Sequence, residues 1–100
     1  MIEHIVFVKV KAQTAVAAVA EVFEALAGLK GLVPGITRFA GGANISPEGL
    51  SRGYTHGFVV TFKDKAARDA YLPHPDHVAA AQKLLAIADG GVEGVLVLDI

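Results

Sequence analysis

The first and last segments of this 100-residue chain are apolar on both of the faces that a β-strand would present. Residues alternate with a period of two over 2–11 and 92–100, which predicts a strand in each segment. The alternating sets are His4, Val6 and Val8 against Ile5 and Phe7 in the first segment, and Val95 and Val97 against Leu96 and Leu98 in the last. Such strands belong to a sheet whose two faces are both apolar, so each face needs a cover.

Helices are predicted between the first and the last strand. Apolar residues recur at helical spacing over Thr14–Lys30, in a short stretch Lys65–Tyr71, and again from Pro75 to the Asp89-Gly90-Gly91 stop. The apolar stripe expected on this last helix consists of Val78, Ala81, Leu84 and Leu85. Thr14 and Asp64 are predicted N-caps, and Pro75 suits a first helical position because its missing N–H would be unpaired there.

Two further strands complete the predicted order. Ile36–Asn44 and Tyr54–Phe62 are joined by a polar loop, Asn44–Gly53, that is long for a hairpin. The order β-α-β-β-α-β predicts an α+β, ferredoxin-like fold, with an antiparallel four-stranded sheet and the helices on one face. One hundred residues make a single domain, 1–100.

The second face of this sheet is predicted to lie bare. The chain is 53% hydrophobic and only 19% charged, so it has more apolar surface than a body of this size usually hides. Pairing two sheets face to face would cover the apolar residues. We therefore expect a homodimer through the sheet face.

Several classes of protein are disfavoured by composition. The net charge is −1, and no cluster of Lys and Arg suggests a nucleic-acid groove or an anionic membrane surface. There is no cysteine for a disulfide or a thiolate nucleophile, and no leader or membrane-spanning run is visible. We expect a soluble, cytoplasmic protein without nucleic-acid or membrane partners.

The side chains that could move a proton near neutral pH are concentrated in one quarter of the chain. Three of the four histidines and both tyrosines lie within residues 53–77. His77 follows Pro75 into a helix, whose positive dipole end should keep the imidazole neutral and able to act as a general base. Tyr71 could orient a carbonyl or donate a proton. The alternative is that both side chains brace this corner through hydrogen bonds to the backbone.

Two interpretations are possible for each of His4 and His56. His4 and His56 occupy strand faces that are otherwise apolar, where they could polarise a ligand carbonyl or serve as satisfied core residues. A metal site is disfavoured because the set lacks a clear carboxylate ligand, and no cofactor is expected. His74 is expected to cap the helix. The loop residues Asn44, Ser46 and Glu48 are read as solvated turn residues or contacts at the dimer rim rather than catalysts.

Several motifs, in order and over nearly the whole chain, resemble the stress-responsive A/B barrel (Dabb) family. They are His4-Ile5-Val6, Pro34-Gly35-Ile36, Ser46-Pro47-Glu48-Gly49, Gly53-Tyr54-Thr55-His56, Tyr71 with His74-Pro75-Asp76-His77, and Val95-Leu96-Val97-Leu98-Asp99. The resemblance implies a ferredoxin-like fold that dimerises through its sheets into an α+β barrel. Most members of the family have no assigned reaction.

The resemblance also implies roles for particular residues. One plant member is a cofactor-free cyclase that closes a linear polyketide by an intramolecular aldol condensation. Its catalytic Tyr and His match Tyr71 and His77, its pocket histidines match His4 and His56, and a further pocket Tyr is replaced by Leu26. The substrate would therefore differ in shape.

Three functional hypotheses follow. The first is a stress-responsive homodimer of unassigned activity, with a small apolar pocket lined by His4, His56, Tyr71 and His77. The second is a cofactor-independent lyase or cyclase acting on a small apolar carbonyl compound, with His77 as base and Tyr71 as acid. The third, from fold analogy alone, is a haem-degrading or quinol-oxidising monooxygenase.

Overall fold

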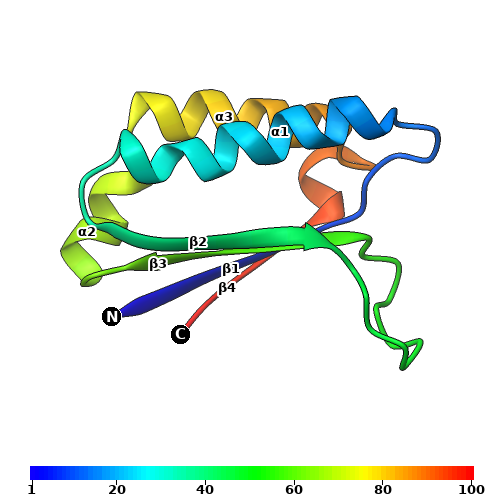
Figure 1. Cartoon of the computed structure of the whole chain (residues 1–100), viewed down its shortest axis with the longest axis horizontal. Coiled ribbons are helices and arrows are strands. Elements are labelled where there is room, and N and C mark those ends of the chain that lie inside the picture. Colours follow the sequence, from blue (N-terminus) through cyan, green and yellow to red (C-terminus); the bar gives the residue numbers. More distant parts are fainter.

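The computed structural model describes all residues from 1 to 100 and has two layers, a sheet and a layer of helices over one of its faces (Figure 1). In chain order the elements are β1 (Ile2–Val8), α1 (Val16–Gly28), the 3₁₀ helix η1 (Leu29–Gly31), β2 (Ile36–Ala43), β3 (His56–Phe62), α2 (Lys65–Tyr71), α3 (Pro75–Ile87), the 3₁₀ helix η2 (Gly91–Gly94) and β4 (Val95–Asp99). None of these helices combines the length and the apolar composition that a membrane span needs.

The sheet has the strand order β2-β3-β1-β4, and all three pairings are antiparallel. The α+β, ferredoxin-like fold predicted from the sequence is therefore confirmed. On β1, His4 lies opposite Val60 of β3 and Asp99 of β4, whereas Val8 lies opposite His56 and Val95. This register decides which of the candidate site residues can meet.

The core lies between the sheet and the helices. The predicted alternation on the first and third strands is confirmed, since Val6, Val8, Val60 and Phe62 are all at most 3% exposed. Helix α1 contributes Val22 and Leu26 to this core, and α3 contributes Ala80 and Leu84. The apolar stripe predicted for α3 is only partly correct, because Val78 remains 42% exposed.

Several strands are shorter than the sequence predicts. β1 ends at Val8 rather than Lys11, because the chain then leaves β3 and Val10 makes only an isolated bridge to Ala88. β4 begins at Val95 rather than Val92. Gly90 and Gly91 have φ values of 79° and 62°, and the chain turns through η2 before it joins the sheet.

The predicted helix caps are confirmed at two of three places. The Asp64 carboxylate accepts from the Ala67 N–H at 2.8 Å, and His74 Nδ1 accepts from the Asp76 N–H at 3.1 Å, ahead of Pro75. The prediction for Thr14 is wrong. Its hydroxyl donates to the carbonyl of Lys11 at 2.7 Å, which closes the preceding turn, and the helix begins after Ala15 without a side-chain cap.

The face of the sheet away from the helices carries no other element of the chain (Figure 1). The register places Ile5, Phe7, Val59, Leu96 and Leu98 on this helix-free face. Phe7 is 41% exposed, Leu96 is 43% exposed and Leu98 is 59% exposed. The bare apolar face predicted from the sequence is thus present.

Candidate functional site

Tyr71 and His77 lie side by side at the corner between two helices. Tyr71 is the last residue of α2, and His77 is the third residue of α3. The short connection between them turns the chain so that the two ring centroids are 4.0 Å apart, with the planes 34° from parallel. Tyr71 is buried and His77 is half-buried, so the pair extends from the core to the surface.

A backbone contact fixes the orientation of the His77 ring. His77 Nδ1 lies 2.9 Å from the carbonyl oxygen of Leu72. Because a carbonyl can only accept, Nδ1 carries the proton and the neutral ring presents an unprotonated Nε2, which has no protein hydrogen-bond partner. Burial lowers the pKa of His77; the Leu72 hydrogen bond opposes this, while His4 and His74 reinforce it. His77 is therefore neutral at pH 7, as expected, with burial as the main cause.

The Tyr71 ring is enclosed by other aromatic rings. It makes edge contacts with Phe62, at 4.9 Å between ring centroids, and with His4, at 5.9 Å. Burial raises the pKa of Tyr71 to about 12, so the hydroxyl keeps its proton at neutral pH. The Tyr71 hydroxyl makes no hydrogen bond to the protein. Its oxygen atom is not fully buried. Bracing by the backbone thus applies to His77 but not to Tyr71.

His4 takes part in a hydrogen-bonded network with Asp99 and Arg68 that the sequence does not predict. Its Nδ1 lies 2.7 Å from one carboxylate oxygen of Asp99, and Arg68 donates to the other oxygen. Burial alone would raise the pKa of Asp99, but the hydrogen bonds from His4 and Arg68 outweigh it and lower that pKa. The ionised carboxylate of Asp99 accepts a hydrogen bond from the Nδ1–H of His4.

The sequence analysis found no clear carboxylate ligand beside the histidines, whereas the structure places the Asp99 carboxylate against His4. Asp99 is the only charged residue within β4, and this is the signal in the sequence that could have identified it. Its pairing with His4 depends on the register between two strands whose paired residues are 95 positions apart. The structure gathers no group of three or more His, Cys, Asp or Glu side chains that could hold a metal ion.

His56 lies elsewhere. It is opposite Val8, whereas His4 is opposite Val60, four residues further along the same strand and so roughly 13 Å away. The His56 ring packs near Phe23, at 5.7 Å between ring centroids, and its Nδ1 lies 2.8 Å from the Thr55 hydroxyl. Leu26 is a core residue at 3% exposure. The structure thus brings together His4, Tyr71 and His77, and separates them from His56.

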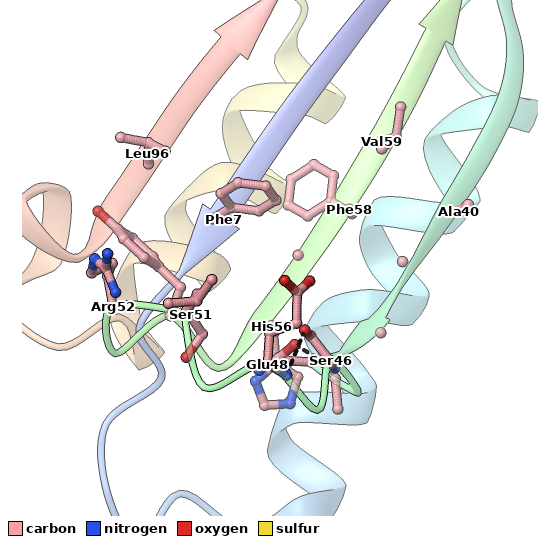
Figure 2. A pocket seen from close by; sticks show the side chains of 17 residues that line it. Phe7, Ala40, Ser46, Glu48, Ser51, Arg52, His56, Phe58, Val59 and Leu96 are labelled. Atoms are coloured by element: carbon pink, nitrogen blue, oxygen red, sulfur yellow. Dashed lines mark hydrogen bonds between the residues drawn. The ribbon is translucent and has the colours of Figure 1, made fainter.

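The two cavities of the chain lie away from this group. One, of about 680 Å³, is on the helix-free face, where the ribbon of the helices lies behind the sheet (Figure 2). The other, of about 510 Å³, lies between the start of α1 and the adjoining ends of β2 and β3. His56 lines both, whereas His4, Leu26, Tyr71 and His77 line neither. The predicted pocket lined by all four His and Tyr residues is therefore not present.

Comparisons with known proteins agree with this fold. The chain is 33% identical to the stress-response A/B barrel domain-containing protein HS1 of Arabidopsis thaliana, over 98% of this chain and 86% of that protein. It is 38% identical to a dimeric ferredoxin-like protein of unknown function from Jannaschia sp. CCS1, with a TM-score of 0.89 and coverage of 99% and 96% of the two chains.

A second solved structure is similar in fold alone. The hydroxynitrile lyase of Passiflora edulis is 22% identical, with a TM-score of 0.87 and coverage of 99% of this chain and 90% of that one. The sequence model of the Stress responsive A/B Barrel Domain, Dabb, matches residues 2–100. With that match, the Arabidopsis relative and the two-layer fold in agreement, this chain belongs to the stress-responsive A/B barrel (Dabb) family.

Proposed function

We propose that this protein is a homodimer whose protomers each use Tyr71 and His77 for cofactor-independent acid–base chemistry on a small carbonyl compound. The observation that carries the proposal is the orientation of His77. Its Nδ1 is held by the Leu72 carbonyl, so the free Nε2 is available as a base beside the Tyr71 ring. A base and a protonated phenol in contact are the two groups that enolate chemistry needs.

The proposed reaction moves one proton between substrate and protein. His77 Nε2 takes a proton from the carbon next to the substrate carbonyl, and the Tyr71 hydroxyl donates a hydrogen bond to the enolate oxygen that forms. The enolate carbon then attacks a second carbonyl carbon, and the new alkoxide takes the proton from the His77 imidazolium. The reverse sequence cleaves the same carbon–carbon bond. Both groups begin in the required states, since burial lowers the pKa of His77 and raises that of Tyr71.

The packing limits the size of the substrate. Tyr71 is 1% exposed, whereas His77 is half-buried, so a substrate would approach from the side of His77. No cavity adjoins the pair. The proposed substrate class is therefore a small aldehyde or ketone.

The proposed dimer is formed by the helix-free faces of two copies. Large apolar side chains on this face are 41% to 59% exposed, as measured at Phe7, Leu96 and Leu98. A soluble monomer rarely exposes a continuous apolar patch of this kind. The relative from Jannaschia sp. CCS1 is a dimeric protein, which supports the same assembly here.

A second candidate is a dimer without turnover that acts in stress protection. The closed interior around Tyr71 and His77 favours it, because no preformed space for a ligand adjoins the pair. The Arabidopsis relative is a stress-response protein by name.

Proton exchange separates the two candidates without knowledge of the natural substrate. Small aldehydes and ketones are incubated with the protein in D₂O, and loss of the α-proton is followed by NMR. The acid–base proposal expects exchange catalysed by the wild type and reduced at least about a hundredfold in His77→Asn and in Tyr71→Phe.

The matched control is His74→Asn, because asparagine is a good N-cap and preserves the start of α3. This variant should keep the wild-type exchange rate within about twofold. Equal rates in His77→Asn and the wild type, with an intact dimer, would remove His77 as the base. A wild type inactive on the whole panel would favour the dimer without turnover.

A further inference from the structure

The connection between β2 and β3, residues 44–55, is here called the β2–β3 arm. In Figure 1 it projects beyond the sheet on the side opposite the helices, at the end of the sheet away from the two termini. The sequence indicates a long polar loop, whose polar residues are expected to be solvated or to lie at the dimer rim. The structure gives this loop a definite direction, away from the body of its own chain.

Local hydrogen bonds shape the arm. Asn44 Oδ1 accepts from the Ser46 N–H at 2.9 Å, and the Ser46 hydroxyl oxygen accepts from the Glu48 N–H at 3.3 Å. Three residues have positive φ values, which turn the chain back toward β3: Gly49 at 73°, Arg52 at 56° and Gly53 at 87°. The arm is therefore a shaped segment rather than an extended strap.

The base of the arm is attached to the sheet. The Asn44 N–H donates to the Thr55 carbonyl at 2.8 Å, and the Thr55 N–H donates to the Val8 carbonyl at 3.0 Å. On the helix-free side, the Tyr54 ring packs near Phe7, at 6.2 Å between ring centroids, with Lys9 Nζ 4.9 Å from the centroid of the Tyr54 ring. These contacts fix the direction in which the arm leaves the sheet.

The outer part of the arm carries two apolar side chains that its own chain leaves uncovered. Ile45 is 93% exposed and Leu50 is 59% exposed. Burying large apolar side chains of this kind against a partner removes their surface from water and favours association. Two such residues on one projecting segment, beside an apolar face, favour a protein contact over a purely solvated turn.

A groove lies between the arm and the helix-free face. Its volume is about 680 Å³, and its floor includes Phe7, Val59 and Leu96 (Figure 2). Gly57 lies opposite Phe7 across the β1–β3 pair, and a Cβ at this glycine would approach the Phe7 ring to 2.9 Å. The glycine thus leaves room for the ring to lie against the sheet, and the floor stays flat and apolar.

The arm adds area to the helix-free face. A stable dimer of standard size buries about 800 Å² of accessible surface on each partner. The arm extends the apolar surface of the sheet beyond its edge, on the side that faces away from the helices (Figure 1).

We propose that the β2–β3 arm clasps a second copy of this chain, with Ile45 and Leu50 packing on the partner and part of the partner filling the groove. The inference rests on the proposed dimer through the helix-free faces. In a two-fold dimer each arm makes the same contact, so the pair of arms adds two equivalent patches to the interface. The occupant of the groove is thus protein rather than a small ligand.

The test compares dimer dissociation constants by sedimentation equilibrium. The arm variant is the double substitution Ile45→Asp and Leu50→Asp, and we expect it to raise the Kd at least about tenfold. The matched control is Leu32→Asp with Val92→Asp, two residues that are 60% and 69% exposed and lie outside the helix-free face. The control should keep the Kd within about twofold of the wild type.

A third variant separates the arm from the sheet. Leu98→Asp alters the helix-free face alone and should raise the Kd if the sheets form the dimer. A raised Kd for Leu98→Asp with an unchanged Kd for the arm variant would overturn the arm proposal and leave the sheet dimer standing. A wild type that stays monomeric at the highest attainable concentration would overturn both.

A spin label then locates the contact. The chain has no cysteine, so Ile45→Cys can carry a single nitroxide. The labelled protein is mixed with ¹⁵N-labelled wild type, and only the partner's amides are observed. We expect broadening at β1 and β4, on the partner's sheet. Broadening confined to the partner's α1 and α3 would overturn the proposed arrangement, whether or not the chain dimerises.

Discussion

The two faces of the sheet are built by the same alternation, yet they have different surroundings. On the covered face, Val8 and Phe62 are fully buried beneath helices of the same chain. On the helix-free face, Phe7 and Leu98 remain 41% and 59% exposed. Alternation therefore identifies apolar faces but not what covers them. The covered face should determine the stability of the fold, and the helix-free face should determine association.

The largest effect should come from matched phenylalanines on the two faces. Phe62→Ala removes a fully buried ring and should lower the free energy of unfolding by about 3–5 kcal/mol at every protein concentration. Phe7→Ala should instead weaken the dependence of Tm on protein concentration, because it removes part of the proposed interface. Thermal unfolding at several concentrations distinguishes them. Equal losses, independent of concentration, would contradict the division of roles.

Alkaline pH should reveal the buried tyrosine. The pKa of Tyr71 is raised from 10.0 to about 12. Its contribution to the free energy of unfolding is therefore complete below pH 10 and is lost as pH rises through about 12. Two pKa units correspond to about 3 kcal/mol. Urea unfolding between pH 9 and 12 should therefore show a smaller loss of stability for Tyr71→Phe than for the wild type. Tyr54→Phe, on the arm, is the control and should keep the wild-type loss.

Asp99 provides a sharper test of the covered side. Asp99→Ala leaves the buried Nδ1–H of His4 without its acceptor and should reduce the free energy of unfolding by about 1–3 kcal/mol. Glu93→Ala, which removes an exposed carboxylate from η2, should change it by less than about 0.5 kcal/mol. Chemical denaturation measures both. A loss for Asp99→Ala no larger than for Glu93→Ala would show that the His4 contact adds nothing to stability.

The smallest predicted effect is the acid sensitivity caused by His77. Its pKa in the folded protein lies below the usual 6.5, so the unfolded chain binds more protons in that range. The stability contribution is complete above pH 6.5 and is lost as pH falls through the folded-state pKa. His77→Gln should flatten the stability curve in this window. An unchanged curve would contradict a neutral, buried His77.

Local sequence patterns predict much of the fold. The alternation of His4, Val6 and Val8 is readable because a strand presents successive side chains to opposite faces. Pro75 marks the start of α3 through its fixed geometry, and His74 caps it. Tyr71 and His77 could be proposed as neighbours because only a short turn separates them.

The rest of the site depends on register, which one sequence does not specify. The contact between His4 and Asp99 joins strands from opposite ends of the chain, and Arg68 reaches it from α2. His56 shares a face with His4, but the register places it at the other end of the sheet, so a common pocket was the wrong expectation. The prediction of an N-cap at Thr14 is wrong for a local reason, because the Thr14 hydroxyl closes the preceding turn instead.

The strand order has a consequence for how the chain folds. β1 lies between β3 and β4, so the first strand to be synthesised has its second edge paired only by the last. Until residues 95–99 are available, the β4 edge of β1 has no partner and His4 has no carboxylate. Loop closure over such distances is slow and costs entropy before contacts form. Removing β4 should therefore leave a chain that collapses without reaching the native sheet, and folding should be completed at its C-terminal strand.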